Sequence, residues 1–219
     1  GLGHWRGQLR QAIALAPPHL SVYDLTLEPG TVFAQRHDRS QLQLPDVDLG
    51  ADLMELTWAE LSAAGYGHYE ISNYALPGHA SRHNRVYWSG AGWWGFGMGA
   101  TAAPWGERLA RPRTREAYAD WLAQPGSPPA SPGQAYPGMP LDERLLVGLR
   151  RREGVSMPAL LAQVGLGPEA LAALRGRLEP WIGEWLLRIE GPRWRLSDPA
   201  GLALSNGVLR ELLAWWQEQ

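Results

Sequence analysis

A short segment in the first half of the chain combines the residue types that an iron porphyrin requires. The segment Arg82-His83-Asn84-Arg85-Val86-Tyr87-Trp88 carries an imidazole, two guanidinium groups and two large aromatic rings. An imidazole nitrogen can be the axial ligand of heme iron, and arginines can pair with the propionates of the macrocycle. The same residues also fit a capped loop whose aromatic side chains enter the core, and spacing alone favours that second interpretation. Gly78 and Ser81 lie close by, so a helix around His83 is doubtful.

The other five histidines show no spacing typical of a metal site. His79 lies four residues before His83, but Gly78 and Ser81 make a helix there doubtful, so the helical i, i+4 pair of a zinc protease is not expected. No cluster of acidic residues surrounds the histidines. We therefore interpret each as a loop or core histidine. They are His4, His19, His37, His68 and His79.

A glycine-rich stretch, Gly95-Phe-Gly-Met-Gly99-Ala-Thr-Ala102, is a second candidate. Glycines at alternate positions of a strand leave one face without side chains, so a ligand or another backbone can approach closely. The spacing is not that of a dinucleotide-binding fingerprint, and no helix follows at once. Packing inside a barrel explains the pattern equally well.

A third candidate is the polar run Glu70-Ile-Ser-Asn-Tyr74 at the end of an expected strand, with Thr26 and Glu28 at the same level of the preceding strand. In α/β sheets the carboxyl ends of parallel strands bind ligands. The sequence contains no defensible serine–histidine–aspartate order, phosphate-binding loop or carboxylate pair.

Composition excludes several classes of protein. The 219 residues contain no cysteine, so these residues cannot form a disulfide, a thiolate zinc site or a cysteine-ligated iron–sulfur cluster. The net charge is −2 although every basic residue is arginine, which argues against nucleic-acid binding. No apolar run approaches the roughly 18–20 residues of a membrane span.

The pattern of the first half predicts an α/β fold. We expect a helix ending at Pro17-Pro18, a strand over 19–28, a helix from Pro45-Asp46 to Gly65, and strands over 66–75 and 93–103. This alternation favours parallel strands.

The second half differs in character. A proline-rich linker over 111–140 is expected to contain a short helix at 114–123. Helices are then expected at 141–149, after Ser156 and at 171–187, followed by a hairpin over 186–196 and a last helix at 208–216. Three helices, a two-stranded wing and a final helix predict a winged-helix-like domain.

Several of these segments, in this order, resemble the oxygen-independent coproporphyrinogen III oxidase (HemN) family of radical-SAM proteins, and in particular its heme chaperone (HemW) branch. The most specific is His83-Asn-x-x-Tyr-Trp88, which is typical of the chaperone branch. The other matching segments are Leu20-Ser-Val-Tyr-Asp-Leu-Thr-Leu-Glu-Pro-Gly-Thr31, Gly65-Tyr66, Tyr69-Glu-Ile-Ser-Asn-Tyr-Ala75, Pro77-Gly78-His79, Leu141-Asp-Glu and Gly148-Leu-Arg150.

The resemblance implies a domain division and a set of site residues. Residues 1–110 would be the C-terminal portion of a partial (βα) radical-SAM barrel, 111–140 the linker, and 141–219 a HemN C-terminal winged-helix-like domain. His83 would ligate heme iron with Tyr87 and Trp88 on the macrocycle, while Thr26 and Thr101 would approach S-adenosylmethionine. The family pattern Gly-Pro-Gly-Ala-His-Ser reads Gly-Met98-Gly-Ala-Thr101-Ala102 here, which weakens the assignment of Thr101.

The resemblance also implies a cytoplasmic heme chaperone that passes heme to an acceptor protein. Its [4Fe-4S] cluster cysteines and first S-adenosylmethionine motif belong to the N-terminal half of the family fold, so we expect this sequence to be roughly the last half of such a protein. Oxidative decarboxylation of coproporphyrinogen III in porphyrin biosynthesis is the alternative function, and we expect no radical chemistry from these residues alone. Nucleic acid is not an expected partner.

Overall fold

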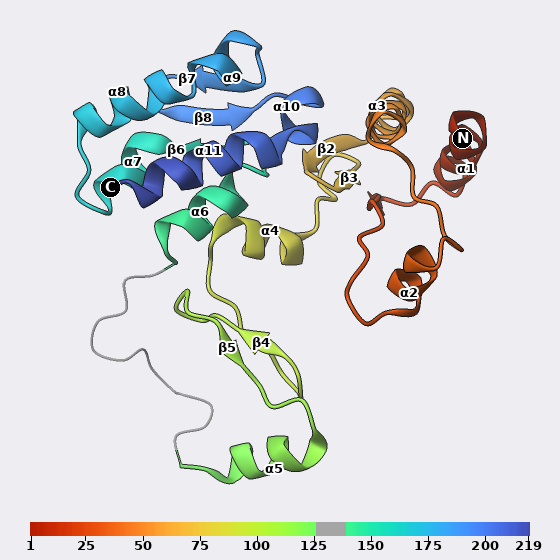
Figure 1. Ribbon diagram of the computed structural model, residues 1–219, viewed down its shortest axis with the longest axis horizontal. Coiled ribbons are helices and arrows are strands. Elements are labelled where there is room, and N and C mark those ends of the chain that lie inside the picture. Colours follow the sequence, from red (N-terminus) through yellow and green to blue (C-terminus); the bar gives the residue numbers. More distant parts are fainter. Residues whose placement is uncertain (126–138) are drawn as a thin grey trace. The chain divides into compact units, whose positions relative to one another are not determined.

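The computed structural model describes residues 1–125 and 139–219 and divides the chain into two compact units (Figure 1). The first unit contains 1–80 together with 198–203, and the second contains 81–197 together with 204–219. Among the described residues, no helix combines the length and the apolar character that crossing a bilayer requires.

The first unit is built from helices and one three-stranded sheet. Its α-helices are α1 (Leu2–Ala14), α2 (Val32–Asp38), α3 (Val47–Ala63) and α10 (Ala200–Ala203), and its strands are β1 (His19–Ser21), β2 (Gly67–Glu70) and β3 (Asn73–Ala75).

Apolar side chains from α1, α3 and the sheet form the core of this unit. Helix α1 packs against α3, and the indole Nε1 of Trp5 donates a 2.8 Å hydrogen bond to Oγ1 of Thr57. A contiguous apolar cluster of this kind is what holds a small unit together. Its buried members are Leu9, Leu56, Leu61, Tyr66 and Tyr74.

Helix α3 begins and ends where the sequence predicts. The Asp46 carboxylate accepts a 2.8 Å hydrogen bond from the backbone N–H of Leu49, which satisfies one of the free donors of the first turn. At the other end Gly65 has φ +88°, a conformation that glycine adopts without a steric penalty. Helix α2 was not predicted. The sequence marks it through Thr31, whose hydroxyl caps the N–H of Ala34.

The predicted parallel pairing is wrong for the described residues, where every strand pair is antiparallel. The expected strand over 66–75 is a hairpin, because the chain turns at Ile71-Ser72 and β3 pairs with β2. The expected strand over 19–28 shortens to β1. Its partner β3 begins at Asn73, opposite Ser21, so little backbone remains to pair with the residues that follow.

The second unit contains the remaining elements. They are α4 (Arg82–Ser89), β4 (Thr101–Ala102), β5 (Leu109–Ala110), α5 (Arg115–Ala123), α6 (Leu141–Gly148), β6 (Val155–Ser156), α7 (Met157–Ala162), α8 (Pro168–Arg177), α9 (Glu179–Gly183), β7 (Leu187–Glu190), β8 (Arg193–Leu196) and α11 (Ser205–Gln217).

The hairpin predicted over 186–196 is confirmed as β7–β8, and β6 adds a third strand beside β8. The single helix expected over 171–187 is wrong, since α8 ends at Arg177 and α9 starts at Glu179. Pro180 has no N–H for a carbonyl one turn earlier and its ring would clash there, so one uninterrupted helix is unfavourable.

The short helix expected at 114–123 is α5, capped by the hydroxyl of Thr114. The rest of the predicted proline-rich linker falls mainly on 126–138, which lie outside the described residues. The division into 1–110, 111–140 and 141–219 stays a prediction.

The glycine-rich stretch does not form the single strand expected over 93–103. Trp93 and Ala103 form an antiparallel bridge, and positive φ angles at Gly97 (+90°) and Gly99 (+73°) reverse the chain between them. The predicted close approach involves backbone: a Cβ on Gly95 would lie 2.1 Å from the carbonyl oxygen of Thr101. Glycine is therefore required at 95 by packing.

Candidate functional site

His83 lies on a helix, contrary to the sequence-based expectation. The hydroxyl of Ser81 accepts a 3.2 Å hydrogen bond from the N–H of Asn84 and so starts α4 immediately before the histidine. Gly90 then ends the helix in the left-handed conformation, at φ 72°. Ser81, one of the two residues that made a helix doubtful, is therefore its N-terminal cap, while Gly78 lies outside the helix.

Helix α4 brings His83 and Tyr87 together. They are four residues apart and therefore share one face of the helix. Their ring centroids are 4.9 Å apart with planes at 86°, an edge-to-face contact. Trp88 is half-buried and lies a further step around the helix, so it does not share the face of His83.

The imidazole of His83 is exposed and available to a ligand. Among the described residues it forms no hydrogen bond or ion pair. A neutral imidazole offers one nitrogen lone pair, which is the donor that heme iron takes from histidine. The exposed imidazole therefore fits one axial position of heme, with the phenol ring of Tyr87 beside it.

Of the two arginines in the segment, one is already engaged. The guanidinium of Arg85 pairs with Glu153 at 2.5 Å, and Arg151 lies 3.5 Å from the same carboxylate. Burial opposes ionisation of Glu153, but a backbone hydrogen bond and the charges of Arg151 and Arg85 together lower its pKa. Arg82 is exposed, and within the described part of the chain it forms no ion pair, so it is the cation available to an anionic group.

Tyr87 also contacts Trp93, which the sequence did not single out. The two ring centroids are 4.8 Å apart with planes at 75°. His83, Tyr87 and Trp93 thus form a row of rings, each packed edge to face against the next. Sequence spacing gave no signal for this contact, because Trp93 follows the helix and reaches Tyr87 only through the turn at Gly90.

The expected S-adenosylmethionine contacts are both exposed, and they lie in different units. Thr26 belongs to the irregular segment after β1 in the first unit, and Thr101 lies on β4 in the second. The sequence supplies no thiolate for a cluster, and the described residues contain no group of three histidine, aspartate or glutamate side chains that could hold a metal ion.

The polar run from Glu70 to Tyr74 forms a buried network rather than a substrate-facing edge. The hydroxyl of Ser21 donates to Oδ1 of Asn73 at 2.5 Å, and the Asn73 amide donates to Oε1 of Glu70. Because 22–28 is not a strand, the expected placement of Thr26 and Glu28 beside Glu70 is wrong, and both are exposed.

A second buried polar contact was not predicted, since its partners are 130 residues apart. His68 Nδ1 lies 2.6 Å from Oδ1 of Asp198, and the His68 ring stacks on Tyr74 at 4.3 Å with planes at 9°. Burial, then the charges of Asp198 and Glu70, raise the pKa of the Tyr74 phenol. His68 Nε2 is buried without a hydrogen-bond partner among the described residues.

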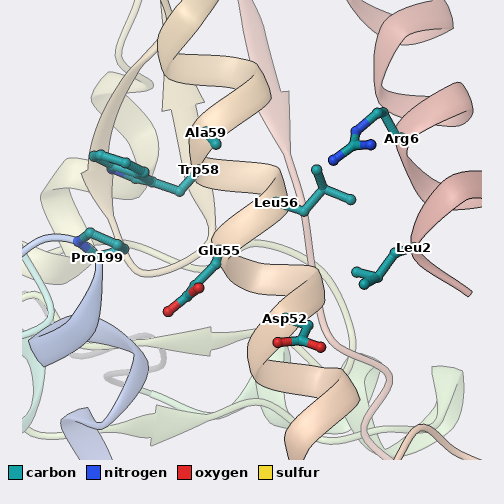
Figure 2. Close-up of a pocket in the computed structure, with 8 residues that line it drawn as sticks. All are labelled: Leu2, Arg6, Asp52, Glu55, Leu56, Trp58, Ala59 and Pro199. Atoms are coloured by element: carbon teal, nitrogen blue, oxygen red, sulfur yellow. The ribbon is translucent and has the colours of Figure 1, made fainter.

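The first unit also contains a cavity of about 570 Å³ along α1 and α3 (Figure 2). Asp52 and Glu55 of α3 supply its acidic groups, while Arg6 of α1 pairs with Glu60 at 3.1 Å. None of the site residues predicted from the sequence lines it. The other lining residues are Leu2, Leu56, Trp58, Ala59 and Pro199.

No protein-family model matches the chain, but individual proteins do. A heme chaperone HemW from Synechocystis sp. is 38% identical over 232 residues, covering 98% of this chain and 56% of that protein. A heme chaperone HemW from Mycobacterium tuberculosis is 37% identical over 202 residues, covering 92% and 49%. The chain thus spans about half the length of these curated relatives.

A solved structure also matches. Coproporphyrinogen III oxidase (HemN) from Escherichia coli, described as a radical SAM enzyme, has a TM-score of 0.62 and 16% identity, covering 93% of this chain and 49% of that one. At this identity the match shows the fold, which is a mixed α/β fold corresponding to part of HemN. The chain belongs to the HemW heme chaperone and HemN-like radical SAM family.

Proposed function

We propose that the exposed face of α4 binds heme, with His83 as an axial ligand of the iron. The observation that best supports this proposal is the exposed imidazole of His83, packed edge to face on Tyr87 in a sequence that matches heme chaperones. Bound heme would supply the iron that takes the imidazole nitrogen. Arg82, the exposed arginine at the start of α4, would pair with a heme propionate.

The proposed role of the protein is to hold heme and pass it to an acceptor protein. The relatives named heme chaperones support this role, and an exposed ligand suits it, because a carrier must release what it binds. Tyr87 would pack against the macrocycle. Trp88 is a proposed contact as well, reached from the side of the helix next to that face.

The finer architecture belongs to the same proposal. Residues 1–110 would correspond to the C-terminal part of a partial radical-SAM barrel, and 141–219 to the winged-helix-like domain of HemN. Thr26 and Thr101 are the proposed S-adenosylmethionine contacts. A [4Fe-4S] cluster does not fit the residues present, since no cysteine is among them, and we assign no radical step or coproporphyrinogen oxidation to them.

Hemin titration of the whole chain tests the proposal. His83→Ala removes the axial nitrogen, so we expect hemin affinity to fall at least about tenfold and the Soret band to move. His37→Ala is the matched control, because His37 is exposed on α2 in the other unit, and it should behave like the unmodified chain. Equal affinity and equal spectra for the unmodified chain and His83→Ala would refute the proposal.

A further inference from the structure

Trp93 lies outside the segment 83–88 that resembles the heme chaperones, yet its ring contacts Tyr87 of that segment. Its centroid is 4.8 Å from that of Tyr87, whose own ring lies 4.9 Å from His83. Trp93 is half-buried, so one side of the indole packs while the rest faces solvent. The Tyr87 ring is therefore in contact with both His83 and Trp93.

The backbone around Trp93 is held in place. Its N–H donates to the carbonyl of Ala103 at 3.2 Å, and the Ala103 N–H donates back at 2.9 Å. The preceding residue is Gly92, where a Cβ would lie 2.1 Å from the carbonyl oxygen of Pro104. Such close packing leaves this backbone little room to move, so the position from which the Trp93 side chain extends toward Tyr87 is fixed.

The helix itself is anchored at other points of the same unit. Arg85 pairs with Glu153 in the loop before β6, and a Cβ on Gly90, at the end of α4, would lie 3.0 Å from Cδ of Arg144 on α6. These contacts fix the helix axis. They do not fix the rotation of the Tyr87 and His83 side chains. The contacts between the rings limit that rotation instead.

We propose that Trp93 is a positioning residue of the heme site, which holds the Tyr87 ring and through it sets the orientation of the His83 imidazole. This inference rests on the proposed function of α4. Residues that orient a metal ligand from behind affect metal affinity although they never touch the metal. Without Trp93 the Tyr87 ring could turn into the vacated space, and the imidazole would lose the edge-to-face contact that limits its rotation.

The test compares Trp93→Leu with Trp94→Leu by hemin titration of the whole chain. Trp94 is the neighbouring residue and also packs edge to face, against Trp105 at 5.5 Å, but it takes no part in the row of rings that ends at His83. We expect Trp93→Leu to weaken hemin binding about three- to tenfold and to shift the Soret band, while Trp94→Leu leaves both unchanged.

Trp93→Phe retains an aromatic ring beside Tyr87 and should restore most of the affinity and the unmodified Soret position. It also keeps the test decisive if Trp93→Leu fails to fold, as judged by far-ultraviolet circular dichroism. Unchanged hemin binding by Trp93→Leu, an equal effect of Trp94→Leu, or a Trp93→Phe chain that folds but binds as weakly as the leucine variant would each overturn the inference. His83→Ala in the same series keeps the proposals separate, because it tests ligation by His83 independently of Trp93.

Discussion

Gly154→Ala is expected to lower the free energy of unfolding by about 3 kcal/mol, because two costs combine at this position. Gly154 has φ +61°, which a residue with a Cβ adopts only at a steric cost. The added Cβ would also lie 2.1 Å from the carbonyl oxygen of Trp194 and 2.6 Å from Cβ of Arg195, so the backbone of β8 or of the turn must move.

Gly191→Ala is the matched control for that variant. Gly191 has nearly the same φ, +60°, but a Cβ there would meet nothing within 4 Å. It should therefore show only the conformational cost, about 1 kcal/mol. Urea unfolding followed by circular dichroism measures the free energy of unfolding of both variants. Equal losses would show that the clash of the added Cβ with β8 has no cost.

The second large effect is expected for Asp198→Ala, which should lower the free energy of unfolding by about 2 kcal/mol. The His68 side chain is 3% exposed. Among the described residues, Nδ1 of its ring is hydrogen-bonded to Oδ1 of Asp198, and Nε2 has no partner. Removing the carboxylate leaves both ring nitrogens buried without a partner, and a buried polar group in that state costs more than the bond itself contributes.

The double variant His68→Leu, Asp198→Ala separates this cause from simple loss of packing. Once the imidazole is also gone, neither position 68 nor position 198 carries a polar side chain without a partner, so most of the stability should return. Asp24→Ala, at an exposed position, should change the unfolding free energy by less than about 0.5 kcal/mol. A double variant as unstable as Asp198→Ala would contradict the explanation.

Local signals predicted several helix ends and one hairpin turn. Asp46 and Thr114 accept the N–H groups of the first helical turn, Gly65 ends a helix at a positive φ, and Gly191-Pro192 joins two strands. Each of these features depends on residues within a few positions of one another. Such features can be recognised in a sequence because the chemistry and the geometry are both local.

The direction of the strands could not be predicted in the same way. Alternation of strands and helices favoured parallel pairing, but whether the chain from Tyr66 to Ala75 continues or turns back depends on the polar network at its middle. Asn73 bonds to both Ser21 and Glu70, one of which lies 52 residues away. Contacts over such distances leave no periodic trace in the sequence.

The candidate site shows the same division. His83 and Tyr87 were identified from residue type and order, although the helix that joins them was doubted because Ser81 and Gly78 suggested a loop. Trp93 and Glu153 were not identified, since they reach α4 through a turn and through a loop 68 residues away. Residue chemistry thus singled out His83 as the candidate ligand, and the fold shows which residues contact its helix.

Rescue of a His83→Gly chain by imidazole tests the central claim most directly. The Soret spectrum of its ferric heme complex would be recorded without imidazole and with it, beside the unmodified chain. If the iron takes its nitrogen from residue 83, the glycine variant loses the spectrum of the unmodified complex and added imidazole restores it. A glycine variant whose heme spectrum already equals that of the unmodified chain would contradict ligation by His83.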